Sequence, residues 1–115
     1  VNVVQPDVCY LGGITRTLKV VEMAQQAGLP CTPHSANLSL VTVFTLHLMG
    51  ALKSAGPYVE FSIEGADYYP WQYGIYEPAL VAVDGKVQIP EAPGWGIEIN
   101  PGFLEKTQHQ ISALD

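Results

Sequence analysis

The chain has 115 residues, of which 48% are hydrophobic and only 14% are charged, and its formal net charge is −6. This acidic balance offers no basic surface for phosphates and argues against a nucleic-acid partner. The length allows one modest domain and excludes a complete (β/α)8 barrel of about 250 residues. The longest mostly apolar stretch, residues 38–52, is shorter than the roughly 20 residues of a membrane span, so no membrane partner is expected.

The first part of the chain alternates short apolar segments with a helical pattern. Residues 1–5 are mostly β-branched and predict a buried strand that ends at Pro6. Apolar residues then recur at helical spacing from Ile14, and Gly28 is typical of the position that follows a helix. Residues 29–32 predict a second, very short strand.

The next segment predicts a second helix and a third strand. The helix is expected from Leu38 to about Lys53, with Asn37 as its N-cap. Its apolar residues lie all round the helix, which indicates that other parts of the protein cover it on both sides. Residues 58–63 predict the third strand. The order strand, helix, strand, helix, strand with short connections is typical of parallel βαβ units.

The last third of the chain has a different character. Tyr and Trp residues crowd the stretch 68–76, and we interpret them as core residues rather than as a binding platform. Residues 79–83 and 86–89, joined by an Asp-Gly turn, predict a β-hairpin. Asn100-Pro101 is expected to start a short final helix around residues 103–106.

These patterns divide the chain into two parts. Residues 1–63 predict a segment of a larger parallel α/β body, and residues 64–115 predict a tail that wraps around it. Three strands cannot close a barrel or cover a helix that is apolar all round, so the sequence predicts a piece of a longer protein.

Two cysteines, Cys9 and Cys31, show no metal-ligand spacing. We expect both to be small buried side chains of a protein in a reducing compartment. No secretory leader opens the chain, and a cytoplasmic location is therefore expected.

Each predicted strand carries a titratable residue where parallel α/β proteins gather their functional groups, at the carboxyl ends of strands. These residues are Asp7, His34 and Glu60. Asp7 and His34 are 27 residues apart, which is one βα unit, so they would project from adjacent strands on the same face. An aspartate held against one imidazole nitrogen fixes the tautomer and raises the histidine pKa above about 6.5. Such a histidine can take a proton from carbon or give one to a leaving group.

Structural roles could explain the same residues. Asp7 could cap the next segment, His34 could be a satisfied polar residue at a strand end, and Glu60 could be a solvated strand residue. His47 is expected to pack in the core rather than bind a ligand. No Gly-x-Ser-x-Gly elbow makes Ser35 a hydrolase nucleophile. Asp7 and Glu60 alone cannot supply three oxygen ligands for magnesium.

Several motifs then occur in a recognisable order. They are Gln5-Pro6-Asp7, Gly12-Gly13-Ile14-Thr15, Pro33-His34 and Val59-Glu60-Phe61, followed in the tail by Glu77-Pro78, Asp84-Gly85, Ile89-Pro90 and Pro93-Gly94-Trp95-Gly96-Ile97-Glu98. Together they resemble the C-terminal part of the mandelate racemase/muconate lactonizing enzyme group of the enolase superfamily. The resemblance covers nearly the whole chain and includes the Asp-to-His interval of the mandelate racemase subgroup.

The resemblance implies an α/β fold, namely the C-terminal portion of a TIM-like (β/α)7β barrel. This portion would comprise the last three strands and their helices, plus a tail with a β-hairpin that returns toward an N-terminal capping domain. It also implies three catalytic residues. His34 would be the general acid/base on one face of the substrate, Asp7 would orient it, and Glu60 would hydrogen-bond the substrate carboxylate.

The chemistry that the resemblance implies is abstraction of the proton next to a carboxylate, with Mg2+ stabilising the enediolate. The longer protein would be an isomerase of the racemase type or a lyase of the acid-sugar dehydratase type. Its partners would be a small carboxylate substrate, broadly a sugar acid, the rest of the barrel, the capping domain and further copies in a homo-oligomer. The interval from His34 to Glu60 is longer than in mandelate racemase itself, so mandelate is not the expected substrate.

The resemblance places the lysine of the opposite face and the three carboxylate metal ligands on earlier strands. The chain is therefore expected to supply no metal ligand and no cofactor-binding residue, and to be inactive by itself. The alternative, from a different class, is a non-catalytic α/β module that self-associates through exposed strand edges.

Overall fold

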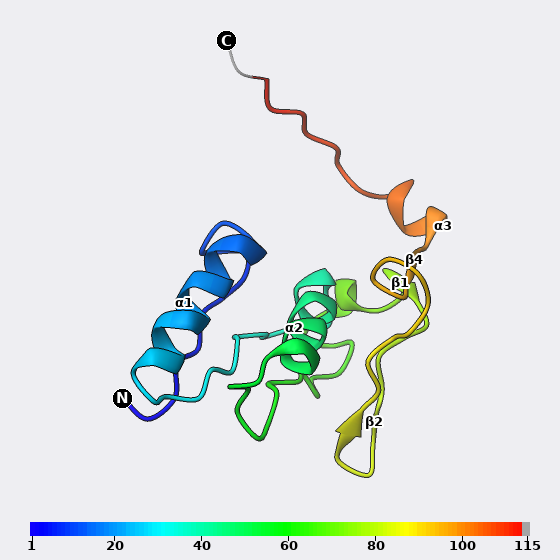
Figure 1. Cartoon of the computed structure of the whole chain (residues 1–115). Helices are drawn as coiled ribbons and strands as arrows, with labels where there is room; N and C mark the ends of the chain where they lie inside the picture. Colours follow the sequence, from blue (N-terminus) through cyan, green and yellow to red (C-terminus); the bar gives the residue numbers. More distant parts are fainter. Residues whose placement is uncertain (114–115) are drawn as a thin grey trace.

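The computed structural model describes residues 1–113, and the last two residues of the predicted tail lie outside this range. Figure 1 shows helix α1 at one side, helix α2 in the centre, and the hairpin and helix α3 at the far side. Among residues 1–113, none of the helices combines the length and apolar character that crossing a bilayer requires. The elements in chain order are α1 (Ile14–Gln26), α2 (Leu40–Ala51), the 3-10 helix η1 (Pro70–Gln72), β1 (Tyr76–Glu77), β2 (Ala82–Val83), β3 (Lys86–Val87), β4 (Glu98–Ile99) and α3 (Pro101–Leu104).

Both long helices form where the sequence predicts them, with a small correction at the start of α2. Helix α1 begins at Ile14 and ends just before Gly28. Helix α2 begins two residues later than predicted, because Ser39 rather than Asn37 is its N-cap. The Ser39 hydroxyl accepts a hydrogen bond from the N–H of Val41, and the Asn37 side chain accepts one from the N–H of Ser39. Residues 40–49 are all buried or half-buried, which confirms that the apolar helix is covered on both sides.

The prediction of three continuous strands at residues 1–5, 29–32 and 58–63 is wrong. The first two segments meet only through isolated parallel bridges, and the third forms no strand within the described part of the chain. Pro6, Pro30 and Pro33 lack the N–H that a continuous ladder needs, so the pairing of these segments stays short. The bridges that remain join Val4 to Cys31, Asp7 to His34, and Cys31 to Ala55.

The first two segments nevertheless keep a parallel register. The N–H groups of Thr32 and His34 donate to the carbonyl groups of Val4 and Pro6, each at 2.9 Å. This register pairs Asp7 directly with His34. Side chains of directly paired residues lie on the same face of neighbouring strands, so the backbone places the two titratable groups together.

The tail is built from two short antiparallel pairs and packs on α2. The predicted hairpin is confirmed at its centre, where β2 and β3 pair around the Asp-Gly turn. The sequence does not predict the second pair, β1 with β4, because each strand has only two residues. Helix α3 begins at Pro101, as predicted, and the Asn100 side chain caps it; it ends at Leu104, two residues earlier than expected. The buried core that joins the tail to α2 contains Val43, Leu46, Ile75, Tyr76 and Leu80.

Two expectations about side-chain burial need correction. In the aromatic stretch, Tyr76 is buried and donates its hydroxyl to the carbonyl of Leu38, but Tyr68 and Trp71 are exposed. Rings in this surface loop contact one another edge-on, which leaves their outer faces in solvent. Cys31 is buried as expected, whereas Cys9 is exposed because it lies in the turn after Asp7.

Trp95 attaches the final part of the tail to α2. Its ring lies 4.7 Å from the ring of Phe44 and 5.4 Å from that of His47, measured between centroids. The Nε2 atom of His47 is 2.9 Å from the carbonyl oxygen of Trp95. His47 is half-buried in this contact, as a packing residue rather than a ligand.

The glycines on either side of Trp95 provide a test of this attachment. Gly94 and Gly96 both have positive φ, of 72° and 70°, so a side chain at either position is strained by about 1 kcal/mol. A Cβ at Gly96 would also lie 2.7 Å from the carbonyl carbon of Pro90, whereas a Cβ at Gly94 would meet nothing within 4 Å. We expect Gly96→Ala to destabilise the protein by roughly 1–3 kcal/mol more than Gly94→Ala in urea unfolding. Equal losses would contradict the close packing.

Candidate active site

The two carboxylate oxygens of Asp7 have separate partners. Oδ1 accepts hydrogen bonds from the N–H groups of Cys9 (2.8 Å) and Tyr10 (2.9 Å) in the turn that follows. Oδ2 lies 2.9 Å from Nδ1 of His34. The cap and the histidine contact, which the sequence left as alternatives, therefore occur together. The turn holds the carboxylate in place while its second oxygen faces the imidazole.

His34 presents its two ring nitrogens to two different carboxylates. Nδ1 faces Asp7, and Nε2 lies 3.7 Å from Oε2 of Glu60. The His34 side chain is 39% exposed, whereas that of Asp7 is 15% exposed. Asp7 is thus the fixed partner within the protein, and Nε2 is on the side from which a small molecule can approach.

Hydrogen bonding sets the protonation of the pair. The hydrogen bond to Asp7 raises the pKa of His34; burial opposes this, and the charges of Glu60 and Asp7 add to it. Burial alone would raise the pKa of Asp7, but the hydrogen bonds from His34 and from the N–H groups of the turn outweigh it and lower that pKa. The result favours an ionised Asp7 beside a histidine that is easier to protonate than usual.

Glu60 reaches the pair without being part of a strand. Its Oε2 accepts a hydrogen bond from the N–H of Ser35 at 2.9 Å, and its side chain is 41% exposed. Ser35 itself is fully buried, and its hydroxyl lies 2.5 Å from Oγ1 of Thr42 in α2. The structure thus brings together all three residues that the sequence singled out, although Glu60 arrives through a loop.

Sequence reasoning missed the role of Ser35. It considered only the hydroxyl, as a nucleophile, whereas the backbone N–H holds Glu60 and the hydroxyl fixes the loop to α2. The available signal was Ser35, a small polar residue directly after the candidate catalytic histidine, together with Thr42 in the first turn of the next helix. A backbone donor, however, cannot be inferred from the residue type.

The described residues do not fit a metal ion. Within residues 1–113, no three His, Cys, Asp or Glu side chains come close enough to share one. Asp7 is already engaged by two N–H groups and an imidazole, and Glu60 by a backbone N–H.

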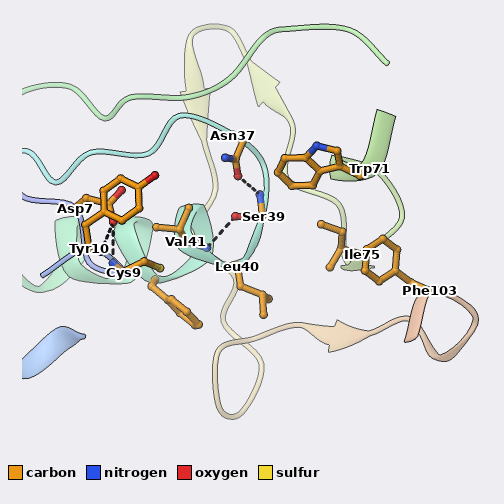
Figure 2. Close-up of a pocket in the computed structure, with 11 residues that line it drawn as sticks. Asp7, Cys9, Tyr10, Asn37, Ser39, Leu40, Val41, Trp71, Ile75 and Phe103 are labelled. Carbon is orange, nitrogen blue, oxygen red and sulfur yellow. Dashed lines mark hydrogen bonds between the residues drawn. The ribbon is translucent and has the colours of Figure 1, made fainter. Parts of the chain in front are cut away.

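The largest cavity near the site, of about 590 Å3, extends from Asp7 toward the tail. Figure 2 shows Asp7, Cys9 and Tyr10 at one end and Trp71 and Phe103 at the other. Neither His34 nor Glu60 lines it. Glu60 instead lines a separate hollow of about 370 Å3, whose other walls include Gln5, Thr32 and Tyr58. His34 lines neither cavity; its Nε2 lies 3.7 Å from Glu60, which borders the second hollow.

Comparison with known proteins links these residues to one family. A sequence model described as enolase C-terminal domain-like matches residues 1–103. Arabinonate dehydratase of Saccharolobus solfataricus is 30% identical over 106 residues, which is 92% of this chain and 27% of that protein. The crystal structure of a candidate racemase from Roseobacter denitrificans is 57% identical, with a TM-score of 0.90, and the match covers 99% of this chain and 31% of that one.

A third relative was solved with ligands. L-Talarate dehydratase from a Polaromonas species, complexed with Mg and L-glucarate, is 25% identical with a TM-score of 0.67, and the match covers 94% of this chain and 26% of that one. The chain thus spans about a quarter to a third of the length of these relatives.

Replacing Asp7 by Asn tests the Asp7–His34 contact while leaving an Oδ1 acceptor for the turn. We expect the pKa of His34, followed by NMR titration, to fall toward the usual value of 6.5. The raised pKa of His34 stabilises the fold at pH values below the pKa of histidine in the unfolded chain, and this stabilisation is lost as pH rises through the pKa of His34 in the folded protein. The lowered pKa of Asp7 stabilises the fold at pH values above 3.8, and this stabilisation is lost as pH falls through the pKa of Asp7 in the folded protein.

The Asp7→Asn change should therefore cost most near pH 5, by about 1 kcal/mol, since His34 is partly exposed and solvent screens the pair. The cost should shrink above about pH 8, where the histidine is neutral in both states. A cost that does not vary between these pH values would contradict the ionic contact.

Proposed function

The chain belongs to the enolase C-terminal domain-like family, in the mandelate racemase/muconate lactonizing group of the enolase superfamily, and on this basis we propose that it is the C-terminal catalytic segment of a longer enzyme. Its fold is part of the enolase C-terminal barrel domain. The proposed reaction is abstraction of the proton next to the carboxylate of a sugar acid, leading to dehydration or racemisation. Relatives named as arabinonate dehydratase and L-talarate dehydratase support this substrate class.

One observation carries the proposal: His34 is held at Nδ1 by an ionised aspartate and presents Nε2 on the side of Glu60. In the neutral imidazole, a proton on Nδ1 that is donated to Asp7 leaves the lone pair on Nε2. This atom can take a proton from the substrate carbon. When it is protonated, the Asp7 carboxylate 2.9 Å from Nδ1 stabilises the imidazolium.

The same arrangement serves dehydration. A protonated Nε2 can deliver its proton to a β-hydroxyl group, which departs as water while the electrons left by the α-proton form the new double bond. His34 can deliver to the hydroxyl group the α-proton that it has itself taken; if it delivers a proton that it already carried, another base takes the α-proton. In a racemase, the proton that His34 removes from one face is replaced from the other.

Glu60 is proposed to contact the substrate carboxylate. An ionised carboxylate only accepts hydrogen bonds, so this contact requires a proton shared between Glu60 and the substrate carboxylate in the complex, whereas in the free chain Glu60 acts on His34 as a negative charge. Oε2 already accepts from the N–H of Ser35, which leaves Oε1 as the atom that would carry the proton. Donors aimed at a developing oxyanion are worth about 3–4 kcal/mol each in other enzymes.

We assign different roles to the two parts of the chain. Residues 1–63 would complete the barrel and hold the three catalytic side chains, and residues 64–115 would pack toward the capping domain. Magnesium would be bound by residues outside this chain, and it would supply the positive charge that stabilises the enediolate. The 115 residues alone are proposed to be inactive for this reason.

The experiment uses the longer protein with a panel of sugar acids in deuterated water, where NMR follows exchange at the α-carbon and formation of product. His34→Gln should lower turnover by roughly 10²–10⁴-fold, the usual contribution of a general acid/base. The matched control is His47→Gln, because His47 contacts the tail rather than the site, and it should retain turnover.

The chain of 115 residues serves as the negative control and should show neither exchange nor product. A folded His34→Gln protein with undiminished exchange and turnover would contradict the proposed role. Turnover by the isolated chain would contradict the proposal that metal ligands lie elsewhere.

A further inference from the structure

Glu60 lies in a loop whose backbone makes no strand pairing in the described structure, yet its carboxylate stays within 3.7 Å of His34. The hydrogen bond from Ser35 fixes one oxygen of the carboxylate. It does not by itself fix the chain on either side of Glu60, because an exposed side chain can follow a moving loop. Val59 and Phe61 on either side of Glu60 pack against the core beside α2, and a side chain of the tail joins the loop after Glu60 to the loop after His34.

Gln72 makes this connection from the tail. Its Oε1 accepts the N–H of Leu38 at 3.1 Å, and its Nε2 donates to the carbonyl of Glu64 at 3.0 Å. Leu38 is four residues after His34, and Glu64 is four residues after Glu60. One side-chain amide thus ties together the two loops that carry the candidate catalytic groups.

The environment of Gln72 makes the tie rigid. The residue is 3% exposed, so its amide exchanges few hydrogen bonds with water. The buried Ser62 hydroxyl lies 3.5 Å from Oε1 of Gln72 and also bonds to the carboxylate of Glu64. A buried amide that lost either backbone partner would leave a polar group unsatisfied, at about 1–3 kcal/mol. These buried hydrogen bonds oppose separate movement of the loop after His34 and the loop after Glu60.

The chemistry of the amide suits this place. The bridge needs an acceptor for one backbone N–H and a donor for one backbone C=O, several ångströms apart on a single side chain. The amides of Asn and Gln offer both side by side on one planar group at any pH, and Gln has the longer reach.

We propose that Gln72 is a positioning residue that sets the separation between His34 and Glu60 through Leu38 and Glu64. Its importance for catalysis rests on the proposed function, but the positioning itself can be measured without turnover. The tail would then do more than cover the barrel, because it would set the geometry of the acid/base site.

The test is an NMR titration of the His34 imidazole in the full 115-residue chain. The charged groups that face this ring are Asp7 and Glu60. Gln72→Met keeps the length and buried volume of the side chain but removes both hydrogen bonds. It should lower the pKa of His34 in the same direction as Glu60→Gln and by no more than that variant does, because it loosens the position of Glu60 beside Nε2 while Asp7 still acts on Nδ1. Gln25→Met, on the exposed side of α1, is the matched control and should cause no shift.

The double variant decides the mechanism. In a Glu60→Gln background, Gln72→Met should cause no further shift, because both changes remove the same interaction. Gln72→Asn keeps the amide but is one methylene too short to span both loops, so it should shift the pKa of His34 in the same direction. This variant serves as the test if Gln72→Met does not fold. An unchanged His34 titration in either folded variant would overturn the proposal, as would a full additional shift without Glu60.

The outcome is independent of the proposed function. The expected titrations together with a longer protein that is inactive on sugar acids would contradict the function and leave the positioning role intact. If the Gln72 variants leave the His34 titration unchanged while the longer protein is active on sugar acids, the positioning role is contradicted and the proposed function stands.

Discussion

Two backbone hydrogen bonds, from the N–H groups of Thr32 and His34 to the carbonyls of Val4 and Pro6, set the register on which the site depends. This parallel register pairs Asp7 with His34, and a shift by one residue would turn the two side chains to opposite faces. The prolines that interrupt the ladder leave few hydrogen bonds to maintain the register. The hydrogen bond between Asp7 and Nδ1 of His34 is thus both a product of the backbone register and a support for it.

Three successive sets of contacts hold the side chains of the site. The turn after Asp7 fixes the aspartate, the aspartate orients the histidine, and loops that are tied by Ser35 and Gln72 bring Glu60 to the free nitrogen. The position of His34 depends on that of Asp7, and the contact with Glu60 depends on the position of His34. The tail therefore makes hydrogen bonds to the loops that follow His34 and Glu60, and it also packs on Val43 and Leu46 in the buried core around α2.

The residues of the site could be predicted from sequence, whereas the means of holding them could not. Asp7 and His34 are separated by one βα unit, and this spacing survives even though the strands around them do not form continuous ladders. Helix α1 was predictable because apolar periodicity and a following glycine are local signals, and α2 because a long apolar run follows cap-forming residues. The bridge through Gln72 joins loops that are far apart in the sequence, and a lone glutamine among aromatic residues gives no sign of its partners. Burial of Tyr76 but not of Tyr68 likewise depends on what the tail packs against, which the residue types do not reveal.

The most direct test of the account is the tautomer of neutral His34, read from the 15N chemical shifts of its two ring nitrogens at a pH above its pKa. If Asp7 accepts the proton of Nδ1, this nitrogen should be the protonated one, and Nε2 should show the shift of an unprotonated nitrogen. His47 and His109 in the same spectrum provide internal references. A neutral His34 that carries its proton on Nε2 would contradict the account, because the nitrogen facing Glu60 would then have no lone pair with which to take a proton.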